Sequence, residues 1–93
     1  MDTMLTMLKT DLGILATTAY DTRLNQLLTA AEQAIEKEGA STLDASDPLD
    51  QQLIVMYAAW LWRKRDTGDG MPRMLRLALN NRIFGEKAVS DNV

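Results

Sequence analysis

The 93-residue chain contains no cysteine and no histidine. Disulfides, thiol chemistry and the common ligand sets for zinc, haem and iron–sulfur clusters are therefore excluded. The most frequent general base of enzymes and their most reactive nucleophile are missing as well. The sequence predicts a protein that is not an enzyme and that holds no metal and no cofactor.

Carboxylates are present, but their spacing does not predict a catalytic or metal site. Asp44, Asp47 and Asp50 recur at every third position of an expected loop. This loop lacks the glycine and the closing glutamate of a calcium-binding loop. The sequence also has no glycine-rich segment of the kind that binds phosphate groups.

Long apolar runs are also absent. The longest spans residues 53–62, about half of the ~20 residues that cross a bilayer as a helix, so no membrane contact is expected. Residues 1–15 lack the basic start and continuous apolar stretch of a secretion signal, which predicts a cytoplasmic product.

The remaining composition is that of a globular protein, with 46% hydrophobic and 25% charged residues. A chain of this length forms one domain. Small domains often gain stability from disulfides, metals or oligomerisation, and the first two are excluded here. We therefore expect the protein to associate with other chains.

Apolar residues recur at helical spacing through most of the chain, and no segment alternates as a strand does. The sequence predicts an all-α fold, a small bundle of four or five helices with a long hydrophobic central helix. The expected domain covers residues 1–85, and a polar C-terminal tail covers residues 86–93. Helices are expected at residues 2–12, 21–39, 48–65 and 72–85.

Several residues mark the expected helix ends. Asp21 is predicted to cap the second helix and Gly39 to end it. Asp47 followed by Pro48 is typical of a helix start, because proline has no N–H to satisfy in the first turn. Pro72 predicts the start of the fourth helix in the same way.

The third helix is apolar on all sides from residue 53 to residue 62. A surface helix is normally apolar along one stripe. This helix is therefore expected to have other helices packed on every side. Three other short helices are expected to be too few for this. The sequence therefore predicts that another copy of the protein packs on part of this helix. Trp60 is assigned to the core of the subunit and Trp62 to its interface, because they lie about 200° apart on a helix.

Charge is distributed unevenly along the chain. Residues 1–50 carry nine acidic and three basic side chains, whereas residues 51–93 carry four acidic and seven basic ones. Such a chain favours contacts between copies over nucleic-acid binding, and its pI of about 4.7 agrees. Arg73 and Arg76 are neighbours on one helix face and are expected to pair with carboxylates of an adjacent subunit. The interface candidates are Trp62, Arg63, Arg65, Arg73, Arg76, Asn80, Asn81, Arg82 and Phe84.

Four segments in order resemble the small head–tail connector (adaptor) proteins of tailed bacteriophages that infect Gram-positive hosts. They are MLTMLKTDLGI (4–14), YDTRLNQLLTAAEQAIEKEG (20–39), LIVMYAAWLWRKR (53–65) and MPRMLRLALNNRIF (71–84). The resemblance covers almost the whole chain. The blocks YAAWLWRKR and MPRMLRLALNNR carry it most specifically.

This resemblance implies a ring of about a dozen copies, a closed homo-oligomer between the portal protein and the next tail-side connector protein. DNA would pass through the lumen without sequence-specific binding. The protein would be part of the virion and would lie in the host cytoplasm during assembly. Asn80 and Asn81 would hydrogen-bond across the interface, and the residues after Phe84 would extend toward the portal.

Two other interpretations stay open. One is a small helical DNA-binding or antitoxin-like regulator that acts as a dimer, in which the turn TGDG (67–70) would precede a recognition helix. Met74, Leu75 and Leu77 are expected to be buried, which argues against a base-reading role. The other is an accessory protein that binds other proteins without forming a ring.

Overall fold

The computed structural model describes the backbone of residues 2–68 and 70–91, and the side chains of this part except those of residues 2, 66, 67 and 87–91. Within these ranges the chain is all-helical and contains no strand, which confirms the predicted all-α small bundle. The four helices are α1 (Asp2–Leu12), α2 (Asp21–Glu38), α3 (Pro48–Thr67) and α4 (Arg73–Asp91).

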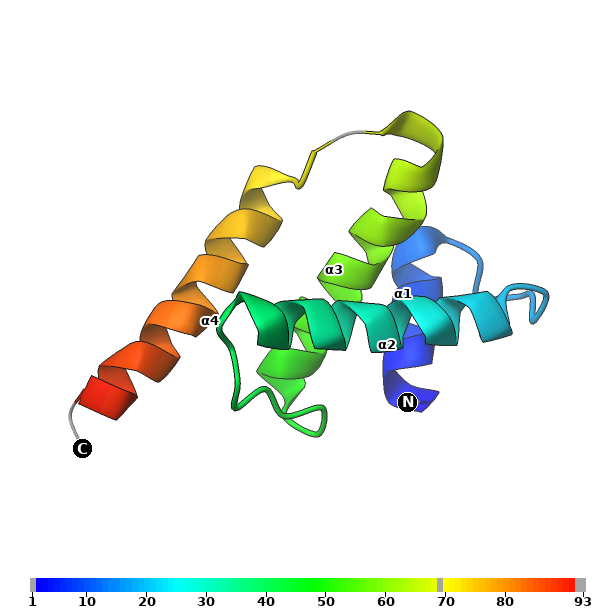
Figure 1. Ribbon diagram of the computed structural model, residues 1–93. Coiled ribbons are helices and arrows are strands. Elements are labelled where there is room, and N and C mark those ends of the chain that lie inside the picture. The colour runs from blue at the N-terminus through cyan, green and yellow to red at the C-terminus, as the bar shows by residue number, and fades with distance from the viewer. Residues whose placement is uncertain (1, 69, 92–93) are drawn as a thin grey trace.

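Helix α3 contacts each of the other three helices (Figure 1). Helix α2 crosses α3 on one side, and α1 lies alongside α3. Helix α4 packs on α3 but diverges from the bundle toward its C-terminal end (Figure 1). This arrangement gives the molecule an elongated outline of 46 × 28 × 17 Å.

The start of α3 follows the prediction. Asp47 accepts hydrogen bonds through Oδ2 from the backbone N–H groups of Leu49 (3.1 Å) and Asp50 (3.0 Å), and Pro48 is the first helical residue. These bonds satisfy two of the N–H groups that a helix start leaves without an intrahelical partner.

The predicted cap of α2 is wrong. Tyr20, not Asp21, occupies the cap position, and its side chain makes no capping hydrogen bond. Asp21 instead lies 2.9 Å from the amino group of Lys9, whose side chain is almost fully buried against the bundle. A buried ammonium requires a carboxylate partner, so Asp21 joins α1 to α2.

The predicted end of the fourth helix near Gly85 is also wrong, because α4 continues to Asp91. A glycine inside a helix costs only about 1 kcal/mol relative to alanine. Glu86, the next residue, offsets this cost by accepting hydrogen bonds from Ser41 and Thr42. The last part of the expected tail, residues 92–93, lies outside the described residues.

The hydrophobic core joins all four helices and is centred on α3. Its fully buried side chains of large volume are Met4, Leu8, Leu24, Leu28, Ile35, Ile54, Leu75 and Leu79. Burying side chains of this size contributes about 1.5–3 kcal/mol each, which is the main force holding the helices together.

The structure corrects the expectation that three helices are too few to cover the apolar residues of α3. Most of the run is buried within the single chain, at Leu53, Ile54, Val55, Tyr57, Ala58 and Ala59. Three helices therefore suffice for this part, because α1, α2 and α4 pack on different sides of α3. Met56, Trp60, Leu61 and Trp62 are only partly buried, and their cover by another copy stays a prediction.

Among the helices that the structure describes, none is both long enough and apolar enough to cross a membrane.

Candidate interaction surface

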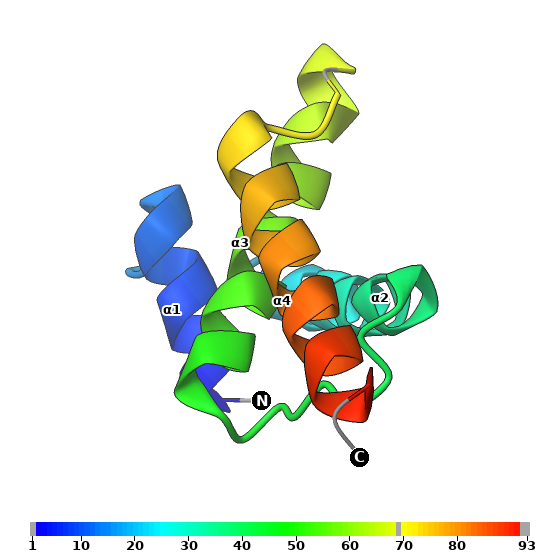
Figure 2. The same ribbon diagram turned by 90° about the vertical axis from the view of Figure 1, so that its left-hand side faces the viewer.

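A groove runs along the side of α3 that α2 does not cover. Figure 2 shows α1 and α4 on either side of α3 here. Two cavities of about 350 and 220 Å³ lie along this groove, and Met56 lines both of them. We call this surface the α3–α4 groove. Its α3 lining is Leu49, Asp50, Gln52, Leu53, Met56, Ala59, Trp60, Arg63 and Lys64.

The larger cavity lies between the end of α3 and the start of α4, with Asp11 of α1 at its edge. Trp60 forms part of its wall, half-buried, with its ring edge-on to Tyr57 at a centroid distance of 5.3 Å. The amino group of Lys64 lies 4.6 Å from the Trp60 ring centroid, a cation–π distance. Trp60 packs against the hydrophobic core, in agreement with its assignment, but it is only partly buried because its ring also borders this cavity.

The smaller cavity lies between the start of α3 and the middle of α4, and it is bordered by an ionic cluster. Arg82 donates from Nε to Asp50 Oδ1 (2.8 Å) and from Nη2 to Asp50 Oδ2 (3.2 Å). Arg82 also donates to Glu86 (3.5 Å) and to the Thr42 hydroxyl (3.2 Å). Asp50 accepts a further hydrogen bond from the backbone N–H of Asp44 (3.0 Å). This cluster fixes α4 to α3 and to the loop before it.

The surroundings of the cluster keep its groups charged. Burial opposes the ionisation of Asp50, but hydrogen bonds from Arg82 and the Asp44 N–H, with the Arg82 charge, outweigh it and lower the pKa of Asp50. The hydrogen bond to Asp50 raises the pKa of Arg82. The Ser41 hydroxyl is the main cause of the lowered pKa of Glu86.

Three of the arginines predicted at the interface pair with carboxylates of their own chain. Arg82 pairs with Asp50 as described, and Arg76 lies 3.2 Å from Glu38. Arg63 lies 3.5 Å from Asp11. The basic second half of the chain thus meets the acidic first half within one molecule. Arg76 was expected to pair with a carboxylate of a neighbouring subunit, but Glu38 of its own chain is also a partner.

Trp62 lies on a different side of α3 from the groove. Its ring is edge-on to Tyr20 at 5.3 Å, and the Arg65 guanidinium lies 3.8 Å from its centroid. These contacts leave it half-buried against the α1–α2 connection. The interface role of Trp62 and Arg65 stays a prediction.

The outer side of α4 carries apolar side chains that the rest of the chain does not cover. Met74 is 72% exposed, Leu77 47% and Phe84 69%. These three residues, the outer α4 stripe, share one face because successive residues turn by about 100°. Leu75 and Leu79 are buried on the opposite face. The expected burial of Leu75 is confirmed, whereas that of Met74 and Leu77 is wrong, since α4 has two apolar faces.

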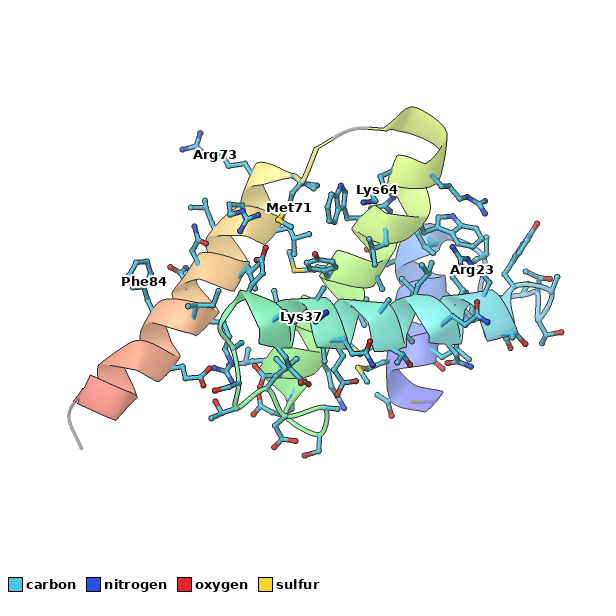
Figure 3. All side chains as sticks on the ribbon, viewed as in Figure 1. Arg23, Lys37, Lys64, Met71, Arg73 and Phe84 are labelled. Atoms are coloured by element: carbon cyan, nitrogen blue, oxygen red, sulfur yellow. The ribbon has the colours of Figure 1, made fainter. Side chains whose placement is uncertain are left out.

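The polar interface candidates of α4 lie beside this stripe. Arg73 and Phe84 both extend away from α2 and α3 (Figure 3). Asn81 is exposed and Asn80 half-buried. Within residues 2–68 and 70–91 Arg73 forms no ion pair, so its charge is available on the surface beside Met74.

Sequence reasoning missed the Asp50–Arg82 pair and the exposure of Leu49. Asp50 lies in the first turn of α3, inside the helix expected at residues 48–65. The pair joins residues 32 positions apart, and no local pattern indicates which arginine reaches which aspartate. Leu49 is 76% exposed at the end of the α3–α4 groove. Its position directly after Pro48, at a helix start, was the only available signal.

The described residues contain no group of three or more histidine, cysteine, aspartate or glutamate residues that could hold a metal ion. No protein-family model, curated protein or solved structure matches the chain.

Proposed function

We propose that this protein is a structural subunit of a tailed bacteriophage, a head–tail connector that forms a ring between the portal protein and the next tail-side protein. The observation that carries the proposal is the combination of the outer α4 stripe with the α3–α4 groove. Large exposed apolar residues along one helix face are typical of a protein–protein contact. The choice of a connector among proteins that bind other proteins rests on the sequence resemblance of the four segments to that family.

In this proposal α3 is the hydrophobic central helix of each subunit, and its partly exposed aromatic ring at Trp60 lies at a contact between proteins. Tryptophan, methionine and arginine are favoured in interface cores, and all three occur around the groove. Subunits of the ring contact one another, the portal and the next connector protein, and DNA passes through the lumen. The role is mechanical and involves no catalysis.

A dimeric DNA-binding or antitoxin-like regulator predicts a different surface on α4. A base-reading helix needs polar side chains facing the groove of DNA. Here the exposed face of α4 presents Met74, Leu77 and Phe84. This face is better suited to a protein contact than to base recognition.

Native mass spectrometry of the purified chain tests the proposal, first alone and then mixed with the portal protein encoded in the same genome. We expect a ring-sized species, either with the chain alone or on the portal. A chain that stays dimeric in both samples and binds duplex DNA would favour the regulator. A chain that is monomeric in both samples would contradict the connector assignment.

A further inference from the structure

The two exposed apolar surfaces of the molecule differ in charge. At the start of α3, Leu49 lies beside the turn that carries Asp44 and Asp47, at the mouth of the smaller cavity. Hydrogen bonds from Ser46 lower the pKa of Asp44, so its carboxylate stays charged near neutral pH. At the start of α4, Met74 lies beside Arg73. One surface is therefore apolar with an acidic rim, and the other is apolar with a basic rim.

The two surfaces face different sides of the molecule, because the outer α4 stripe lies on the face of α4 opposite the buried Leu75 and Leu79. Helix α3 begins at the lower end of the bundle in Figure 1, whereas α4 begins at its upper end. Figure 2 shows the same separation from the side. Because the stripe faces outward, it does not cover the Leu49 end of its own groove, and both surfaces are exposed to another molecule.

We propose that the outer α4 stripe of one copy docks on the Leu49 end of the α3–α4 groove of a second copy, with Arg73 facing the carboxylates of Asp44 and Asp47. This docking mode rests on the proposed function and names the surfaces that join its subunits. The charge difference selects a second copy as the occupant, since the basic rim and the acidic rim belong to the same chain.

The apolar residues and the lengths of the two surfaces also match. Leu49 and Leu53 border the receiving cavity, and Met56 lies between it and the larger cavity. The outer α4 stripe spans eleven residues, from Met74 to Phe84, and its first and last Cα atoms are about 15 Å apart along the helix at 1.5 Å per residue. The α3 lining of the groove spans sixteen residues, from Leu49 to Lys64, about 22 Å along the helix, so the stripe fits along it. Methionine side chains adapt their shape to an incoming helix.

This contact is heterologous, because it joins different surfaces of the two copies. A heterologous contact leaves one free stripe and one free groove on every pair, so a third copy can add in the same way. Repetition closes into a ring when the rotation between copies permits. The arrangement therefore differs from a two-fold dimer, in which both copies use the same surface.

Two substitutions separate the two surfaces without threatening the fold. Leu49→Asp blocks the Leu49 end of the groove and Met74→Asp blocks the stripe, and each changes a highly exposed side chain. Met74 also lines the larger cavity, but it does not line the smaller cavity that receives the stripe. Leu49 and Met74 are each the second residue of their helix, where an acidic residue interacts favourably with the helix dipole. Thr22→Asp is the matched control, since Thr22 is exposed and is the second residue of α2.

We expect Leu49→Asp and Met74→Asp each to weaken self-association by roughly tenfold or more, because a carboxylate would be buried in an apolar contact. Mixed together, they should form a 1:1 heterodimer that does not grow further. The intact stripe of Leu49→Asp docks on the intact groove of Met74→Asp, and both remaining surfaces are blocked. Native mass spectrometry measures the species, and circular dichroism checks that the variants keep their helicity. Thr22→Asp should assemble like the unmodified chain.

The docking mode is overturned if the mixture forms no heterodimer, if either single variant assembles normally, or if the unmodified chain does not self-associate. Portal binding by the unmodified chain without a heterodimer would reject the docking mode and leave the connector function standing. A heterodimer without portal binding would support the docking mode and reject the connector function.

A charge exchange tests the orientation of the two copies. Arg73→Glu and Asp44→Arg should each weaken self-association, because each places like charges opposite one another. The chain carrying both substitutions should assemble better than either single variant. Equal weakening of all three variants would overturn the proposed pairing of the rims.

Discussion

Arg82 of α4 holds Asp50 of α3 through two hydrogen bonds, from Nε to Oδ1 at 2.8 Å and from Nη2 to Oδ2 at 3.2 Å. The Asp50 side chain is 8% exposed and that of Arg82 23%. This bidentate ion pair joins the first turn of α3 to the middle of α4, whereas Arg76 joins α4 to Glu38 of α2.

Removing one partner of this pair should destabilise the protein. We expect Arg82→Ala to lower the free energy of unfolding by about 2–3 kcal/mol, because it leaves the Asp50 carboxylate buried without its counter-charge. Urea denaturation followed by circular dichroism measures the change. Arg76→Ala is the control, since the Arg76–Glu38 pair is exposed and should contribute about 0–1 kcal/mol. Equal losses in the two variants would contradict the structural role of the Asp50–Arg82 pair.

The same pair predicts how stability depends on pH. The pKa of Asp50 is lowered in the folded protein, so the unfolded chain takes up a proton at a higher pH than the folded one. The stabilisation is fully present above the ordinary aspartate pKa of about 3.9 and is lost as the pH falls through the lower folded value. Glu86 acts in the same direction.

Asp50→Asn removes one of these two groups and should flatten the fall in stability on acidification. Melting temperatures measured between about pH 5 and pH 2 in the unmodified chain and in the variant give the comparison. Parallel curves would show that Asp50 does not take up a proton in this range when the chain unfolds.

Two glycines should respond to alanine in opposite directions. Gly39 ends α2 with φ of 134°, and an added Cβ would lie 3.2 Å from Ile83 Cγ2. Gly39→Ala is therefore expected to cost about 1–3 kcal/mol. Gly85 lies inside α4 with no atom within 4 Å of the added Cβ, so Gly85→Ala should stabilise by about 0.5–1 kcal/mol. Thermal melts of both variants test this, and a destabilised Gly85→Ala would argue against a helix through this residue.

The fluorescence of the two tryptophans should respond differently to the loss of Tyr20, because Tyr20 contacts Trp62 and Tyr57 contacts Trp60. Tyr20→Ala removes the ring that packs edge-on against Trp62 and should cost about 0.5–1.5 kcal/mol. In a Trp60→Phe background, where only Trp62 fluoresces, the emission should shift to longer wavelength as the ring becomes more exposed. In a Trp62→Phe background the emission of Trp60, which packs on Tyr57, should not change. A shift in both backgrounds would mean that Tyr20 supports the bundle as a whole.

Local signals in the sequence predicted the helices well. Helical spacing of leucines gave the all-α class, and Asp47 with Pro48 gave the start of α3, because capping depends on residues adjacent in the chain. The predicted helix ends were wrong where a residue with a local capping signal, or the residue next to it, takes part in a contact with a distant part of the chain. Asp21 pairs with Lys9 rather than capping α2, and Gly85 is carried within α4 by the contacts of Glu86.

The candidate surface was predicted only in part. Exposure of Phe84 and Arg73 agrees with their place among the interface candidates, although their contact with another protein stays a prediction. Arg82 was placed in the same set, but it forms an internal ion pair with Asp50. The charge of an arginine is visible in the sequence, whereas its partner is set by the crossing of α3 and α4.

The sequence by itself determined the helical class, the position of α3 and the absence of cysteine and histidine chemistry, since composition and periodicity are properties of the chain alone. Only the tertiary structure decided which of the two apolar faces of α4 is buried. Leu75 and Leu79 face α3, and Met74 and Leu77 face outward, although both sets have helical spacing. Periodicity identifies apolar faces, but the hydrophobic effect has no direction, so the packing of the neighbouring helices determines which face is covered.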